Sequence, residues 1–403
     1  MNGEPAPSPD LRRPTDLVPR ADPGDEPELL DAIRAEIRAS GPMPFARFME
    51  LALYAPGLGY YQQVSRGPGR AADYLTAPES HPIFGWAVAV QLVETWDRLG
   101  RPTVFTVREH GAGPGALAAG IVDGLDRSGS PLRAALRYRV AERSPDRLAQ
   151  VRSRLEALGG GAELVLEPDD GAPIVGAVLA NEVLDALPVH AIEAAPDGAI
   201  LERFVTLDDA EDLAWTSLDP STPALAARLE AEGIRLVPGQ RTEICLEADT
   251  WTATAAAGLR RGLLLLIDYG HPAAARYDPR RGSLLRAYVH HRVHDHVLSN
   301  VGRQDLTAHV DLTAVERAAT TAGLRHLGTT TQAAFLAGLG AGELLVSLQG
   351  EADATLQAYL DARSALFRML DPAVTGRFAV LAFGRDLTGD APLRGFSFAA
   401  PGT

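Results

Sequence analysis

The middle of the chain alternates apolar strand-like segments with helical segments, and this alternation constrains the fold more than any other feature. Four segments have the length and composition of buried strands: 103–109, 136–142, 162–167 and 174–182. Residues 115–127 and 144–158, which lie between these segments, have helical periodicity. Because strands that alternate with helices form parallel sheets covered on both faces, the sequence predicts an α/β fold.

The segments on either side of this middle part complete the expected organisation. Helices are expected at 28–40, 45–54, 86–99 and 311–322, and two further helices are expected within 332–369. Strands are expected at 262–270, 325–331 and 378–387. The chain is therefore divided into a disordered tail at 1–26, N-terminal helices and a lid at 27–100, the first half of the core at 101–188, an insertion with a β-hairpin and a helix at 189–261, the second half of the core at 262–390 with a substrate-side loop at 271–310, and a tail at 391–403.

A glycine loop follows the first strand of the core, in the stretch REHGAGPGALAAGI at 108–121. Gly111, Gly113 and Ala116 satisfy the dinucleotide pattern G-x-G-x-x-[GA], but that pattern also expects an acid about 20 residues later. The next strand-end acid is Glu142, 31 residues after Gly111. The loop equally satisfies the S-adenosylmethionine pattern E-x-G-x-G-x-G, which begins at Glu109 and includes Gly115.

Pro114 helps to separate these two cofactor classes. Proline has no backbone N–H, so Pro114 would weaken a cradle for pyrophosphate. S-adenosylmethionine has no phosphate, and a second-strand acid such as Glu142 is expected to bind its ribose hydroxyls. The sequence therefore favours S-adenosylmethionine, with a tight turn that binds no ligand as the structural alternative.

A second group of polar residues follows the buried strand at 174–182, in the stretch ANEVLDALPVH at 180–190. Asn181 and Glu182 emerge where ligands bind to open α/β sheets, outside the carboxyl ends of the strands. If the chain then turns helically, Glu182 and Asp185 are three residues apart and share one face. Two carboxylates on one face favour a cationic substrate, although one of them could instead cap the turn.

These residues together resemble the MidA family of methyltransferases, which includes the mitochondrial arginine methyltransferase needed for assembly of respiratory complex I. The resemblance runs from about Leu30 to Leu387 and rests on the following motifs: GYY at 59–61, DYLTAPE at 73–79, the glycine loop, ANEVLDALPVH, IDYG at 267–270, LRAYVHHRV at 285–293 and QDLTAHVD at 304–311. It implies a seven-stranded, mostly parallel, Rossmann-like class I methyltransferase sheet that binds S-adenosylmethionine.

The resemblance also assigns roles to individual residues. It places the methionine part of the cofactor on the glycine loop, from Gly111 through Ala112 and Gly113 to Gly115, after Glu109. It places the ribose at Glu142 and the reaction edge at Asn181 and Glu182, and it makes the segment with Tyr61 and Thr76 fold over the cofactor. His291 falls on the family's position, and His291 or His309 would be the base for an oxygen acceptor.

Composition excludes several functions and locations. A formal charge of −14 argues against binding to nucleic acid or to an anionic membrane surface, since both require a basic face. The single cysteine, Cys245, and the absence of a signal peptide in the sequence favour the cytoplasm, and the apolar segments are too short to span a membrane. Five histidines at 290–309 match no common zinc spacing, so no metal is expected.

Three functions are consistent with this sequence. The first is N-methylation of protein arginine, with Glu182 and Asp185 orienting the guanidinium. The second is methylation of an oxygen or nitrogen on a small molecule or peptide, and the third is a non-catalytic assembly factor that binds the cofactor. The expected partner is thus a protein, peptide or small-molecule methyl acceptor, and a homodimer is left open.

Overall fold

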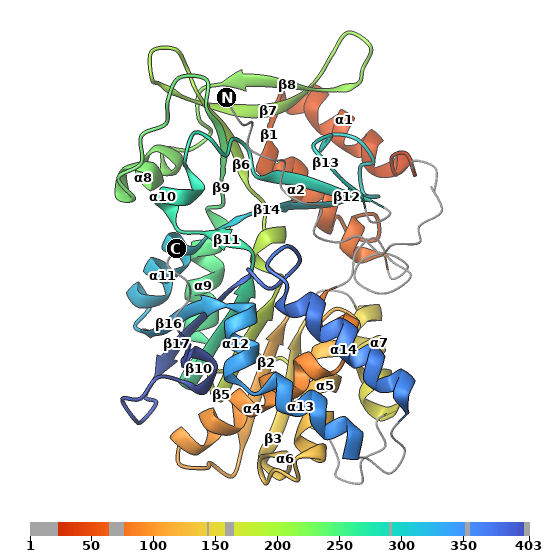
Figure 1. Ribbon diagram of the computed structural model, residues 1–403. Helices are drawn as coiled ribbons and strands as arrows, with labels where there is room; N and C mark the ends of the chain where they lie inside the picture. Colours follow the sequence, from red (N-terminus) through yellow and green to blue (C-terminus); the bar gives the residue numbers. More distant parts are fainter. Residues whose placement is uncertain are drawn as a thin grey trace, which may run out of the picture.

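The computed structural model describes residues 23–63, 76–142, 145–157, 165–289, 292–350 and 355–398. Figure 1 shows two stacked parts, with a large twisted sheet and its helices in the lower part and smaller sheets with two N-terminal helices in the upper part. The arrangement is mixed α/β, which confirms the predicted fold class. The division into six regions stays a prediction.

The large sheet has seven strands and mixed directions. Its order is β16 (Arg325–Thr331), β17 (Ala379–Arg385), β10 (Leu259–Asp268), β5 (Ile174–Asn181), β2 (Phe105–His110), β3 (Leu136–Ala141) and β4 (Val165–Pro168). Neighbours from β10 to β4 pair in parallel, whereas β17 is antiparallel to both β10 and β16. One strand of this sheet, β17, therefore runs against the others, so the sheet is mixed rather than purely parallel.

Both faces of this sheet are covered by helices, as the apolar sequence of β10 requires. Leu263 and Leu265 pack in the same buried cluster as Ile121 of α5, and Leu264 and Leu266 pack with Val315 of α11 on the opposite face. The covering helices are α4 (Ile83–Arg98), α5 (Ala116–Arg127), α13 (Ala341–Ser347) and α14 (Leu356–Leu370) with the first cluster, and α9 (Glu247–Ala257) and α11 (Leu312–Thr321) with the second.

A close contact between two glycines fixes helix α4 against helix α5. An ideal Cβ at Gly85 would lie 2.6 Å from the Cα of Gly120, so a side chain at position 85 would force the helices apart. Helix α4 begins at Ile83, three residues before the predicted start, with Pro82 as its N-cap. Because α5 starts directly after the glycine loop, this contact also places the loop.

The upper part is built mainly from residues expected to form an insertion. Its largest sheet has the order β1 (Met43–Pro44), β7 (Ile200–Leu207), β6 (His190–Ala194) and β9 (Arg241–Ile244), with β8 (Leu213–Leu218) paired to β7. Helices α1 (Pro27–Ser40), α2 (Phe45–Tyr54) and α8 (Ala224–Ala231) pack around it. The predicted N-terminal helices and the predicted hairpin are confirmed.

The segment expected to be a loop at 271–310 contains regular structure instead. Its elements are β11 (Gly270–His271), α10 (Ala273–Arg276), β12 (Leu285–Val289), β13 (Arg292–His294), β14 (Asp305–Ala308) and β15 (Val310–Asp311). Leu285 pairs with Ala308 and Ala287 pairs with Leu306, and these four side chains are buried in the upper core. Alternating burial along β12 therefore stabilises strands in a segment that was predicted to be a loop.

The C-terminal part also differs from the prediction. Instead of two helices within 332–369, the chain forms α12 (Gln332–Gly338), α13, η3 (Leu348–Gly350) and α14. Gly340, with a φ of +78°, separates α12 from α13. The expected tail at 391–403 includes η4 (Arg394–Phe396), where the ring of Phe396 packs against Phe335 of α12.

The remaining described helices are α7 (Pro145–Ala157) and the short η1 (Tyr60–Gln62), α3 (Ala77–Ser80), α6 (Leu132–Ala135) and η2 (Leu184–Ala186). Within the described residues, no single helix has the length and hydropathy needed to cross a membrane. One pair, Gln332–Gly338 with Ala341–Gly350, reaches that threshold only when it is counted together across a bend of 58°.

Candidate active site

The glycine loop turns sharply between β2 and α5. Gly111, Gly113 and Gly115 all have positive φ values, of +63°, +53° and +83°, in a region that favours glycine. An ideal Cβ at Gly111 would lie 2.8 Å from Cγ2 of Val183, and one at Gly115 would lie 3.0 Å from the Cα of Val151. The loop thus approaches other backbone and side-chain atoms more closely than a larger residue would allow.

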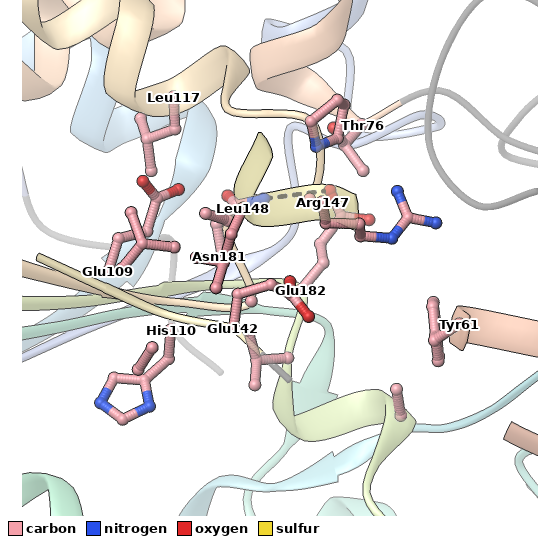
Figure 2. Close-up of a pocket in the computed structure, with 18 of the residues that line it drawn as sticks. Tyr61, Thr76, Glu109, His110, Leu117, Glu142, Arg147, Leu148, Asn181 and Glu182 are labelled. Atoms are coloured by element: carbon pink, nitrogen blue, oxygen red, sulfur yellow. Dashed lines mark hydrogen bonds between the residues drawn. The ribbon is translucent and has the colours of Figure 1, made fainter. Parts of the chain in front are cut away.

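A cavity of about 930 Å³ lies at the carboxyl ends of the central strands, beside this loop. Most of the predicted site residues line it, and Figure 2 shows several of them around it. The predicted residues on its wall are Tyr61, Thr76, Glu109, Gly111, Ala112, Gly113, Glu142, Asn181 and Glu182. Gly115 is not on this wall, because it is the N-cap of α5 and faces α7.

Glu109 is the most deeply buried carboxylate on the cavity wall. Its side chain accepts a hydrogen bond of 2.6 Å from the hydroxyl of Tyr138 in β3. Burial raises the pKa of Glu109 to about 7, although the Tyr138 hydrogen bond opposes this shift. The carboxyl group can therefore change its charge near neutral pH.

Strand register brings Glu142 to the glycine loop. His110 pairs with Ala141 between the parallel strands β2 and β3, and Gly111 donates a backbone hydrogen bond of 3.4 Å to the Ala141 carbonyl. Glu142 directly follows the last residue of β3 and lines the cavity. Its place beside Gly111 is the one predicted for a ribose-binding acid.

Glu182 enters the cavity through an unusual backbone conformation. Its φ is +52°, a left-handed value uncommon for glutamate, directly after β5 ends at Asn181. The backbone N–H of Glu182 donates to the Ile267 carbonyl at 2.8 Å, and the Asn181 Nδ2 group donates to Glu182 Oε1 at 3.4 Å. The sharp turn places Glu182 on the cavity wall, where Figure 2 shows it across from Tyr61.

The carboxylate of Asp268 fixes this turn from the neighbouring strand. Its Oδ2 atom accepts hydrogen bonds from the backbone N–H groups of Val183, Leu184 and Asp185, at 3.2, 2.9 and 3.3 Å. Burial raises the pKa of Asp268 well above its usual range, and the carboxylates of Asp185 and Glu182 raise it further. The IDYG segment at 267–270 therefore holds in place the turn that forms the reaction edge.

Asp185 does not share the cavity wall with Glu182, contrary to the prediction. Its side chain is buried and accepts a hydrogen bond from the Tyr269 hydroxyl, and Asp185 is outside the set of described lining residues. The reason is local: the chain does not continue helically from Glu182 but turns first and then forms η2. The i, i+3 relationship on which the prediction depended is therefore lost.

Of the two predicted histidines, His291 lies outside the described residues and His309 lies within them. His309 is buried, its Nδ1 atom lies 3.3 Å from Nε2 of His271, and desolvation lowers its pKa well below the usual range. His309 is not a lining residue in the described part of the chain, where no group of three potential metal ligands was found either. Asp311 caps α11 by accepting a hydrogen bond from Ala314 N–H at 3.1 Å.

Several lining residues were missed by the sequence analysis. Glu50 and Tyr54 lie four residues apart on α2, whose other residues except Arg47 are apolar, and a polar pair at that spacing was a usable signal. His110 and Trp251 also line the cavity, with ring centroids 5.1 Å apart. No sequence signal joins these two residues, because one ends the first core strand and the other lies on α9.

The wall chemistry fits a nucleoside cofactor with a cationic group. Seven carboxylates, among them Glu109, Glu142 and Glu182, line the described cavity wall together with two arginines, and Pro114 in the loop has no N–H to offer a phosphate. The backbone at Gly111 and Gly113 has no Cβ, so a ligand can lie directly against it. These are the features expected for S-adenosylmethionine.

Comparisons with known proteins agree with this geometry. Residues 87–330, more than half of the chain, match the family model of S-adenosyl-L-methionine-dependent methyltransferases. The mitochondrial protein arginine methyltransferase NDUFAF7 homolog of Drosophila melanogaster is 30% identical over 383 residues, 88% of this chain and 84% of that protein. Mitochondrial NDUFAF7 of Homo sapiens is 28% identical over 351 residues, 79% of this chain and 75% of that protein.

A solved structure is also similar over nearly the whole chain. It is a crystal structure of a Burkholderia thailandensis protein bound to S-adenosyl-homocysteine, with a TM-score of 0.84 and 34% identity. The match covers 92% of this chain and 95% of that chain. The product of methyl transfer from S-adenosylmethionine is therefore bound in a closely similar fold.

Proposed function

The chain belongs to the family of S-adenosyl-L-methionine-dependent methyltransferases, and we propose that its methyl acceptor is the guanidinium of an arginine in a protein. S-adenosylmethionine is its cofactor and supplies, when bound, an electrophilic methyl group on a sulfonium. The identity of the acceptor goes beyond the family assignment. It is supported by the chemistry of one residue, Glu182.

Glu182 is the observation on which the proposal rests. Its carboxylate lines the cavity at the end of β5, and the left-handed turn at this residue is fixed from β10. An arginine guanidinium remains protonated at physiological pH, so no ordinary side chain can deprotonate it. A carboxylate can instead bind two of its N–H groups and draw positive charge toward them, leaving the third nitrogen to attack the methyl group. The methyl–sulfur bond would break with its electron pair left on sulfur, and the methylated nitrogen would release one proton to water.

The protein's own contribution is then mainly alignment. Positioning of two reactants can supply about 7 to 11 kcal/mol of a reaction barrier. The backbone bond from Glu182 N–H to the Ile267 carbonyl and the contacts of Asp268 hold the turn rigidly enough for this purpose. Asn181, whose amide donates to Glu182, would orient the carboxylate.

Similarity supports the same acceptor. The Drosophila melanogaster and Homo sapiens relatives are named as protein arginine methyltransferases, and this chain matches most of their length. Their names also include the word mitochondrial, which does not support the cytoplasmic location expected from composition. The compartment and a homodimer stay predictions.

The strand order supports a finer description of the fold as well. The strands β10, β5, β2, β3 and β4 are parallel neighbours, and the single reversed strand β17 lies between β16 and β10. The glycine loop follows β2, which lies next to β5 at the point where the strand connections change direction. We therefore describe the seven-stranded sheet as Rossmann-like, of the class I methyltransferase type.

The test is transfer from isotopically labelled S-adenosylmethionine to a panel of peptides, read by mass spectrometry. The panel contains one peptide with a single arginine and the same peptide with lysine, citrulline or glutamate at that position. Label on the arginine nitrogens alone supports the proposal. Label on the glutamate peptide, on a hydroxyl, or on none of the peptides while a small-molecule acceptor is methylated would overturn it.

A further inference from the structure

Residues of α2 and η1 form what we call the second end of the cavity, and the family resemblance places one of them, Tyr61, over the cofactor. Helix α2 contributes Glu50 and Tyr54 to it, and the short helix η1 contributes Tyr61 and Gln62. A volume of about 930 Å³ lies near the upper limit for the site of one small ligand. The upper part of the molecule thus supplies one half of a two-reactant cavity, and the assignment of that half to an arginine acceptor rests on the proposed function.

Two tyrosines form the aromatic side of this second end. The rings of Tyr54 and Tyr61 are stacked, with centroids 5.6 Å apart and an interplanar angle of 26°. Each ring is held in place by a hydrogen bond from its hydroxyl group. Tyr54 donates to the Ala186 carbonyl at 2.9 Å, and Tyr61 donates to Asp305 Oδ1 at 2.7 Å. Aromatic faces held in place in this way favour a flat cation such as a guanidinium.

The Tyr54 hydrogen bond also ties α2 to the turn that presents Glu182. Ala186 is the last residue of η2, and both Ala186 and Leu187 line the cavity. The aromatic pair and the Glu182 carboxylate therefore belong to one connected wall. Tyr61 and Glu182 line the same cavity, where Figure 2 labels both.

A second carboxylate lies at this end of the wall. Glu50 forms an ion pair of 2.8 Å with Arg47, which also binds Glu36 at 3.0 and 3.2 Å. Two carboxylates share one guanidinium in this cluster, so its formal charge is negative. Among the described lining residues, the only arginines are Arg147 and Arg152, and both lie on α7.

From these contacts we infer that α2 and η1 form the acceptor-binding half of the cavity. Tyr54 and Tyr61 receive the flat face of the target guanidinium, which Glu182 orients. Glu50 attracts a second positive charge that adjoins the target arginine in the substrate. The substrate class is accordingly an arginine in a locally basic segment of a protein.

The experiment measures peptide binding to the protein saturated with S-adenosylhomocysteine, by titration calorimetry, and methyl transfer to the same peptides. The probes are a short peptide with one arginine between two lysines, the same peptide with glutamates in place of the lysines, and the lysine-flanked peptide with citrulline for arginine. We expect the wild-type protein to bind the lysine-flanked arginine peptide best. Binding does not require turnover, so it tests the acceptor site separately from the reaction.

Matched variants isolate the roles of the charge and the rings. Glu50→Gln should lower the affinity for the lysine-flanked arginine peptide about two- to fivefold, the range for an exposed ion pair. It should also reduce the preference for this peptide over the glutamate-flanked one. Glu36→Gln is its control, because it removes the same charge from the same Arg47 cluster without touching the cavity wall. Tyr54→Leu should weaken binding roughly two- to thirtyfold, while Tyr54→Phe keeps the ring and most of the affinity.

The outcomes separate this inference from the proposed function. Equal peptide affinities in Glu50→Gln, Tyr54→Leu and wild type, together with normal arginine methylation, would overturn the acceptor half while leaving the function intact. Binding that depends on Glu50 and Tyr54 without transfer to arginine would support the acceptor half and overturn the function. Loss of S-adenosylhomocysteine affinity in Tyr54→Leu would also count against the inference, since it would place Tyr54 in the cofactor half.

Discussion

Asp268, the last residue of β10, accepts a hydrogen bond of 2.9 Å from the backbone N–H of Leu184 in the turn that follows β5. The same carboxylate binds the N–H groups on either side, and its second oxygen accepts from Tyr269 N–H at 2.8 Å. Both oxygens are thus occupied by N–H donors. Through this contact a buried scaffold residue controls the turn that carries Glu182 into the cavity.

Asp268→Asn should lower turnover much more than it weakens cofactor binding. An asparagine places an NH₂ group against an N–H donor at one of the two oxygen positions, so the turn must shift and Glu182 with it. We expect a loss of about 1 to 3 kcal/mol in the free energy of unfolding, the usual effect of a mismatched buried hydrogen bond. Urea unfolding and kcat measure these effects. Asp208→Asn, in a turn of the upper sheet, is the control, and equal kcat values in the two variants would refute the positioning role.

Glu182→Gln tests the residue that carries the proposed function. The change keeps the size of the side chain and removes its charge, so transfer to an arginine peptide should slow roughly ten- to a hundredfold. S-adenosylhomocysteine affinity should change little, because the guanidinium is the expected partner. Glu230→Gln, at an exposed position on α8, controls for loss of one charge. Normal kcat in Glu182→Gln would contradict the assignment.

Asp185 should affect stability rather than chemistry. Its carboxylate is buried and bonded to the Tyr269 hydroxyl, away from the described cavity wall. Asp185→Asn and Tyr269→Phe should each lower the free energy of unfolding by about 1 to 3 kcal/mol. A double variant should cost less than the sum, because the two residues share one contact. Chemical denaturation of the four proteins measures this, and strict additivity would argue against the bond.

Glycine substitutions in the loop should separate cofactor binding from backbone strain. Gly111→Ala adds a Cβ beside Val183 at a φ of +63°. It should lower the affinity for S-adenosylhomocysteine roughly tenfold or more. Gly129→Ala imposes a similar left-handed strain, at a φ of +59°, in open space after α5. Titration calorimetry should show weak binding for the first variant and normal binding for the second. Gly113→Val should abolish binding.

Glu109 should make stability depend on pH near neutrality. Because burial raises its pKa to about 7 from the ordinary 4.5, the folded protein holds a proton that the unfolded chain releases between these values. Stability should therefore fall as the pH rises from about 4.5 to about 7, and the contribution of this group is on the order of 3 kcal/mol. Glu109→Gln should lack this component, so its free energy of unfolding should fall less than that of wild type over the same range. Parallel pH profiles for the two proteins would contradict the shift.

The sequence was sufficient for the fold class because its signals are local. The alternation of strand and helix in the middle of the chain, the helices at 28–40 and 45–54, and the cap at Asp311 follow from apolar periodicity and from side-chain hydrogen bonds to nearby backbone. The strands at 285–289 and 305–308 were missed, because their stability depends on burial of Leu285 and Leu306 in an upper core formed with distant segments. Strand pairing between segments separated in sequence leaves only a weak local signal.

The candidate site shows the same division. The glycine loop, Glu142 and Asn181 were identified from sequence, since parallel strands bring their carboxyl ends to one edge whatever the side chains do. The direction taken by the chain after Asn181 was not identified from sequence. Asp268 fixes that turn by accepting backbone hydrogen bonds from Val183, Leu184 and Asp185, which lie 83 to 85 positions before it. The sequence by itself determined the fold class and the cofactor. Only the tertiary structure decided that Asp185 is buried against Tyr269 and that α2 adds Glu50 and Tyr54 to the wall, because contacts between distant segments set the direction of each of these side chains.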